Sequence, residues 1–66
     1  MYVIINGQAC RLARGATVAQ AVRVVTTATK GVAAAVNDVV VSRADWEARP
    51  IAEGDKVEIL IAVQGG

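Results

Sequence analysis

Both ends of this chain have the alternating apolar pattern of a β-strand, and this limits the folds that the chain can adopt. Met1, Val3 and Ile5 share one face of the first segment, and residues 56–63 alternate in the same way. A chain of 66 residues buries only about 60% of its unfolded surface, so its most apolar strands belong in the interior. We therefore expect one domain in which the first and last strands are central neighbours.

The segment after the first strand contains clear turn and helix signals. Asn6-Gly7 is typical of a two-residue hairpin turn and predicts a returning edge strand over Gln8–Leu12. Thr17 and Gln20 have the spacing of a capping box. We expect a helix from Val18 to about Thr26 that frays after that, because the β-branched run Val24–Thr27 has low helix propensity.

A second hairpin and a final strand follow the helix. Val32–Val36 and Val39–Val41 are short apolar segments separated by a tight turn at Asn37-Asp38. The pattern over Ser42–Asp45 predicts one helical turn that places Trp46 in the core. A last strand parallel to the first requires a right-handed crossover over the helix. The predicted fold is α+β, a β-grasp or ubiquitin-like layout with a mixed four- to five-stranded sheet and one main helix on one face.

The composition excludes several classes of function. The chain has no histidine and one cysteine, which argues against a metal site, a histidine-dependent triad or an internal disulfide. Cys10 has no second thiol or base near it in the sequence, so we interpret it as a small buried or half-buried apolar residue. A net charge of +1 argues against nucleic-acid binding. No apolar run is long enough for a membrane span and no secretory signal is visible, so we expect a cytoplasmic protein.

The chain ends on Val63-Gln64-Gly65-Gly66. We expect residues 1–62 to form the domain and residues 63–66 to form a flexible tail. Without a Cβ at Gly65 or Gly66, such a tail can bring its terminal carboxylate into a narrow active site of another protein. The carboxylate is therefore the candidate reactive group.

Several of these segments together resemble one known family. They are Val36–Trp46, Gly54–Ile59 and Ala62–Gly66, together with the Asn6-Gly7 turn and the helix entry at Gly15-x-Thr17-Val18. Their sequences and spacings are similar to those of the ThiS family, the sulfur carrier proteins of thiamine biosynthesis. The resemblance covers nearly the whole chain.

The resemblance implies a carrier that is not itself an enzyme and has no cofactor of its own. An ATP-using adenylyltransferase that resembles ubiquitin-activating enzymes would adenylate the carboxylate of Gly66. Sulfur from a cysteine desulfurase or another donor would then convert it to a thiocarboxylate. Thiazole synthase would accept this sulfur for the thiazole ring of thiamine.

A carrier also needs a surface on which its partner enzymes dock. If the end strands are neighbours, Val3, Ile5, Ile59 and Ile61 face the helix. The alternate residues then share the uncovered face, where exposed apolar side chains often mark a partner site. We predict that this docking surface consists of Tyr2, Ile4, Leu60 and Ala62.

Two other functions are consistent with the same residues. The small subunit of molybdopterin synthase and ubiquitin-like modifiers also end in Gly-Gly, so the recipient of the sulfur could differ. Alternatively, the chain could be a non-catalytic interaction module with an inert tail. A role as an enzyme is disfavoured because no acid–base constellation is visible in the sequence.

Overall fold

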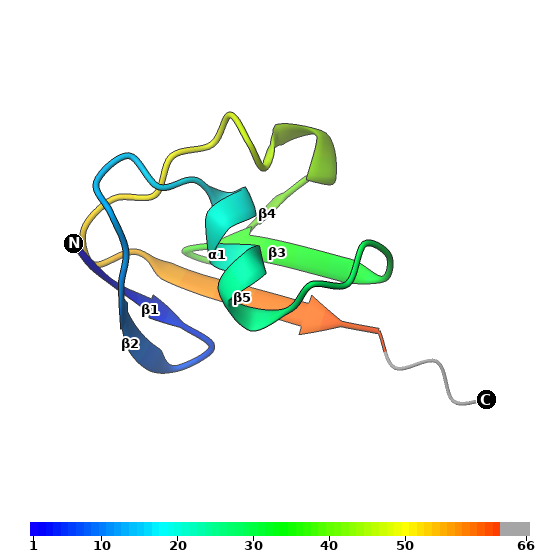
Figure 1. The fold of residues 1–66 in the computed structure, drawn as a ribbon, viewed down its shortest axis with the longest axis horizontal. Helices are drawn as coiled ribbons and strands as arrows, with labels where there is room; N and C mark the ends of the chain where they lie inside the picture. The colour runs from blue at the N-terminus through cyan, green and yellow to red at the C-terminus, as the bar shows by residue number, and fades with distance from the viewer. Residues whose placement is uncertain (63–66) are drawn as a thin grey trace.

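The computed structural model describes residues 1–62 of the chain, which fold into five strands, one α-helix and one 3-10 turn (Figure 1). The predicted tail, with Gln64, Gly65 and Gly66, lies outside the described residues. The elements are β1 (Tyr2–Ile5), β2 (Gln8–Arg11), α1 (Val18–Val25), β3 (Val32–Val36), β4 (Val39–Val41), η1 (Arg43–Asp45) and β5 (Lys56–Ile61).

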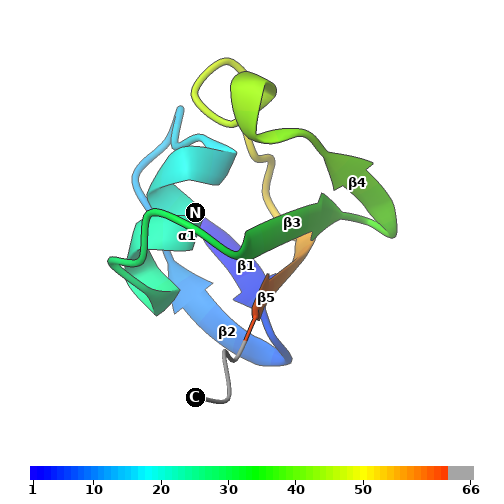
Figure 2. The same ribbon diagram turned by 90° about the vertical axis from the view of Figure 1, so that its right-hand side faces the viewer.

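The sheet is mixed and has the order β2-β1-β5-β3-β4. β1 and β5 are parallel neighbours, whereas the β1–β2, β3–β4 and β3–β5 pairs are antiparallel. Figures 1 and 2 show α1 on one side of this sheet. The predicted β-grasp layout, with the end strands at the centre, is confirmed.

The core lies between α1 and the face of the sheet that the helix covers. α1 contributes small apolar side chains, and the Thr17 N–H donates to Gln20 Oε1 at 2.8 Å, as the capping pattern predicted. Trp46 is only 7% exposed, and its Nε1–H donates to the Val41 carbonyl at 2.9 Å. The buried cluster comprises Val3, Ile5, Val18, Ala19, Ala21, Val22, Ala34, Val36, Trp46, Ile51, Val57 and Ile59.

One residue predicted to face the helix is not covered by it. Ile61 lies on the same side of β5 as Val57 and Ile59, yet it is 42% exposed. The eight-residue helix is about 12 Å long, whereas the six-residue strand spans about 20 Å. α1 therefore covers only part of β5, and the prediction for Ile61 was wrong in its burial.

Candidate functional site

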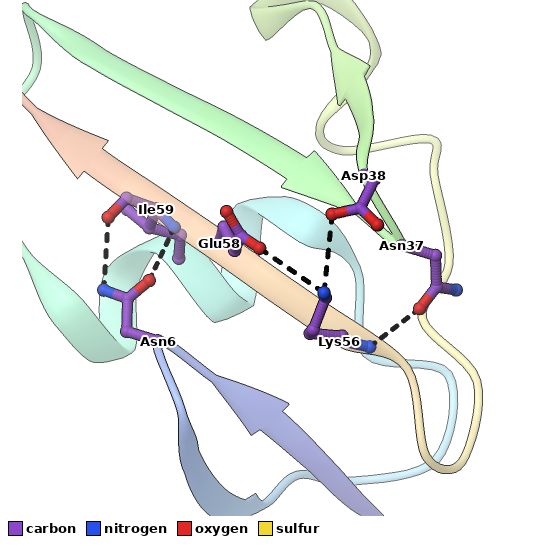
Figure 3. A network of polar contacts seen from close by, with 6 residues as sticks. All are labelled: Asn6, Asn37, Asp38, Lys56, Glu58 and Ile59. Atoms are coloured by element: carbon purple, nitrogen blue, oxygen red, sulfur yellow. Dashed lines mark hydrogen bonds and ion pairs between the residues drawn. The ribbon is translucent and has the colours of Figure 1, made fainter.

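Two asparagines in turns hold the strand that leads to the C-terminus (Figure 3). Asn6 and Asn37 each have a φ of 50°, a left-handed conformation that asparagine tolerates better than most residues. The Lys56 N–H donates to Asn37 Oδ1 at 3.0 Å, and the Asn37 N–H donates to the Lys56 carbonyl at 2.8 Å. Asn37 thus anchors the start of β5 on the β3 side.

Asn6 anchors β5 on the β1 side. Its Nδ2 donates to the Ile59 carbonyl at 3.1 Å, and its Oδ1 accepts from the Ile59 N–H at 2.8 Å. β1 itself pairs with β5 only at Ile4–Lys56 and Ile5–Val57. The Asn6 carboxamide therefore extends the ladder beyond the last residue of β1.

Sequence reasoning treated Asn6 and Asn37 as turn residues only. The available signal was the repetition of asparagine at the first position of both two-residue turns, in hairpins that flank the same strand. A side chain with one donor and one acceptor at that position can replace a backbone peptide group.

The last described residue is fixed from the β3 side. The Ala62 N–H donates to the Gly31 carbonyl at 2.6 Å. Gly31 has a φ of +70°, and a Cβ added there would lie 3.2 Å from the Ala62 Cβ. The positive φ favours glycine, and an added methyl group would require Ala62 to shift by a few tenths of an ångström. The hydrogen bond sets the position of the chain directly before residues 63–66.

The predicted docking residues are exposed, but the register separates them. Tyr2, Ile4 and Leu60 are 51%, 41% and 70% exposed, and Ala62 is exposed as well. Ile4 lies opposite Lys56, so Leu60 is four residues further along β5, about 13 Å away. Glu58 lies between them on the same face, and Lys56 lies directly beside Ile4. The open face thus has two apolar regions rather than one, and the docking role stays a prediction.

The two regions differ in their neighbours. The Arg11 guanidinium lies 4.9 Å from the centroid of the Tyr2 ring, and its Nη2 donates to the Tyr2 hydroxyl at 2.6 Å. Leu60 lies beside Ala33 of β3 and two residues before the exposed Ala62. Val40 of β4, 76% exposed on the same face, lies opposite Ala35, level with Glu58, and is outside this region. One region is therefore aromatic and cationic, and the other is aliphatic.

Charged side chains form the strip between the regions. Lys56 Nζ lies 3.4 Å from Asp38 Oδ1 and 3.7 Å from Glu58 Oε1, as Figure 3 shows. All three side chains are about half exposed or more, so these pairs contribute little to stability. They give the strip two negative charges and one positive charge.

No group of three potential metal ligands occurs in residues 1–62. Cys10 is half-buried and packs against the core, as predicted. None of the helices in this part of the chain is long and apolar enough to cross a lipid bilayer.

The mixed sheet, the helix across one face and the bare Gly-Gly end define a small β-grasp protein. The family model of the ThiS family matches residues 3–66. The chain therefore belongs to the ThiS family, as its sequence motifs indicated.

Two solved structures support this assignment. The crystal structure of the thiamine biosynthesis protein ThiS from Geobacter metallireducens is similar with a TM-score of 0.78 and 26% sequence identity, over 100% of both chains. The solution structure of a thiamine biosynthesis protein from the same organism has a TM-score of 0.80 and 26% identity, over 100% of this chain and 88% of that one. No curated protein sequence matches the chain.

Proposed function

We propose that this protein is the sulfur carrier for synthesis of the thiamine thiazole, with the carboxylate of Gly66 as the group that carries sulfur. The observation that supports this most strongly is the match of the family model over residues 3–66, which include the terminal Gly-Gly. The partners are a ubiquitin-activating-like adenylyltransferase, a cysteine desulfurase or other sulfur donor, and thiazole synthase. We place the reaction in the cytoplasm.

The chemistry requires activation by another protein. A free carboxylate is a poor electrophile, and its adenylation with release of pyrophosphate makes a mixed anhydride. A persulfide sulfur then displaces AMP, and a second thiol reduces the resulting S–S bond to leave the thiocarboxylate. Slender residues at positions 65 and 66 allow the reacting carbon to come within about 3–3.5 Å of the attacking sulfur. The carrier supplies no catalytic side chain.

The open sheet face is the proposed docking surface for both partner enzymes. Its members are Tyr2, Ile4, Leu60 and Ala62, all of them exposed. Because Glu58, paired with Lys56, lies between the two apolar regions, a partner that contacts both regions also has to accommodate the charged strip. Ala62 and, two residues before it, Leu60 are the members nearest to residues 63–66.

Intact-mass measurement tests the proposed function. Incubation with ATP, the adenylyltransferase and a sulfur donor should add about 16 Da, the difference between sulfur and oxygen. A chain that lacks Gly66 is the control and should gain nothing.

The possible outcomes separate the three functions. A mass gain followed by transfer to thiazole synthase supports the thiamine carrier. A mass gain with delivery to a molybdopterin precursor or to a protein lysine supports a molybdopterin carrier or a modifier. If the intact chain gains no mass, or if the chain without Gly66 transfers sulfur equally well, the carrier function is wrong and an interaction module remains.

A further inference from the structure

The β1-facing edge of β5 has an unpaired peptide position at Ile61. Backbone groups alternate between the two sides of a strand. Val57 accepts from the Asn6 N–H on the β1 side, and Ile59 bonds to the Asn6 carboxamide on the same side. Ala62 instead bonds to Gly31 on the β3 side. The N–H and C=O of Ile61 therefore point to the β1 side, where residues 1–62 provide no partner.

The reason for the gap is that β1 is too short. β1 ends at Ile5, and the Asn6 side chain extends its ladder only to Ile59. Figure 1 shows β5 continuing past the β1–β2 hairpin, and Figure 3 shows it continuing past Asn6. Asn6, Leu60 and Ile61 are all exposed, so the space beside Ile61 is accessible.

We infer that an extended backbone segment of the activating enzyme adds to the sheet beside Ile61, in the line that β1 leaves free. This inference rests on the proposed function. The Asn6 carboxamide exchanges two hydrogen bonds with Ile59, as one residue of an antiparallel strand does. The next such position is Ile61, about 7 Å further along β5.

The position of this edge explains why the enzyme would use it. Ile61 directly precedes Ala62, which Gly31 fixes on the other side of the strand. A second pair of hydrogen bonds at Ile61 would hold β5 from both sides up to its last residue. The partner would then control the direction in which residues 63–66 leave the sheet. Main-chain pairing of this kind adds affinity without reading side chains.

The chain is short enough for chemical synthesis, which allows the Ile61 N–H to be replaced by an ester oxygen. The matched control is the same replacement at Val40. Val39 pairs with Val36 across a two-residue turn, so the next N–H, that of Val40, points to the free edge of β4. Each ester removes one N–H that faces a free edge of the sheet. Each also makes the carbonyl of the preceding residue, Leu60 or Val39, a weaker acceptor for its hydrogen bond from β3.

We expect the Ile61 ester to bind the adenylyltransferase about 10-fold more weakly than the native chain by calorimetric titration, because a partner carbonyl loses its donor. The Val40 ester should bind within about 2-fold of native. The two esters should have similar melting temperatures. The inference is overturned if the Ile61 ester binds like the native chain, or if both esters weaken binding equally. It is also overturned if the Ile61 ester alone has a lower melting temperature, because that result would reveal a hydrogen-bond partner within the chain.

The mass assay distinguishes this inference from the proposed function. A native chain that gains sulfur while the Ile61 ester binds normally overturns the strand addition and retains the carrier. A native chain that binds the enzyme but gains no sulfur overturns the carrier; the two esters then still decide the strand addition. A native chain that does not bind the enzyme overturns both.

Discussion

Asn6 combines two roles at one position. Its left-handed backbone conformation closes the first hairpin, and its carboxamide pairs with Ile59, which is 53 residues later in the chain. The hairpin turn and the attachment of the C-terminal strand thus depend on the same side chain. Few residue types combine tolerance of a positive φ with a donor and an acceptor on a short side chain.

We predict that Asn6→Ala lowers the free energy of unfolding by about 3 kcal/mol, from two lost hydrogen bonds and the strain of a left-handed alanine. Urea denaturation measures this change. Asn6→Gly is the control, because glycine removes the bonds without the strain and should cost about 2 kcal/mol. A loss below about 1 kcal/mol for both variants would show that the carboxamide contributes nothing to the attachment of β5.

The turn at Asn6 could be predicted from the sequence, but its long-range bond could not. Asn-Gly between two apolar segments is a local signal. The contact with Ile59 depends on the register of two strands from opposite ends of the chain, which no local pattern contains. The same applies to the indole of Trp46: its burial was predicted, whereas its hydrogen bond to Val41 was not.

At the scale of elements, the lengths of α1 and β5 decide what remains uncovered. The helix ends at Val25, and Thr26 already has an extended φ of −154°. The low helix propensity of the β-branched run therefore predicted this end closely. The alternation of apolar residues placed Ile61 on the correct side of β5. The exposure of Ile61 depends on how far α1 reaches along that side, which the alternation does not contain.

We predict that Gly31→Ala destabilises the fold more than Gly15→Ala does, by about 1 kcal/mol in urea denaturation. Both glycines have a positive φ, +70° and +83°, so the backbone strain is matched. Only at Gly31 would the new Cβ approach another residue, at 3.2 Å from Ala62. Equal losses would mean that the chain end accommodates the methyl group freely.

At the scale of the whole molecule, the topology could be predicted because each connection between successive elements has a physical constraint. Two apolar end strands, one helix between them and a right-handed crossover leave one compact arrangement for so short a chain. The set of open-face residues followed from alternation. The division between Ile4 and Leu60 did not, because the parallel register at Lys56 was unknown.

The separation of core and open face leads to a prediction for Leu60→Asp. Leu60 is 70% exposed, so we expect the free energy of unfolding to change by less than about 1 kcal/mol while binding to the adenylyltransferase weakens at least 10-fold. Val40→Asp, at a 76% exposed position on the same face, adds the same charge far from β1 and should bind normally. If Leu60→Asp and Val40→Asp bind the adenylyltransferase with the same affinity, Leu60 is excluded from the docking surface.

The parallel pairing of the first and last strands has a mechanical consequence. Hydrogen bonds between neighbouring strands run across the strand direction. Traction along the terminal strand therefore loads the bonds to Asn6, β1 and β3 in shear, all together, instead of opening them one after another. An enzyme that draws the acyl terminus toward its nucleotide would strain the whole sheet before it could peel away a single strand.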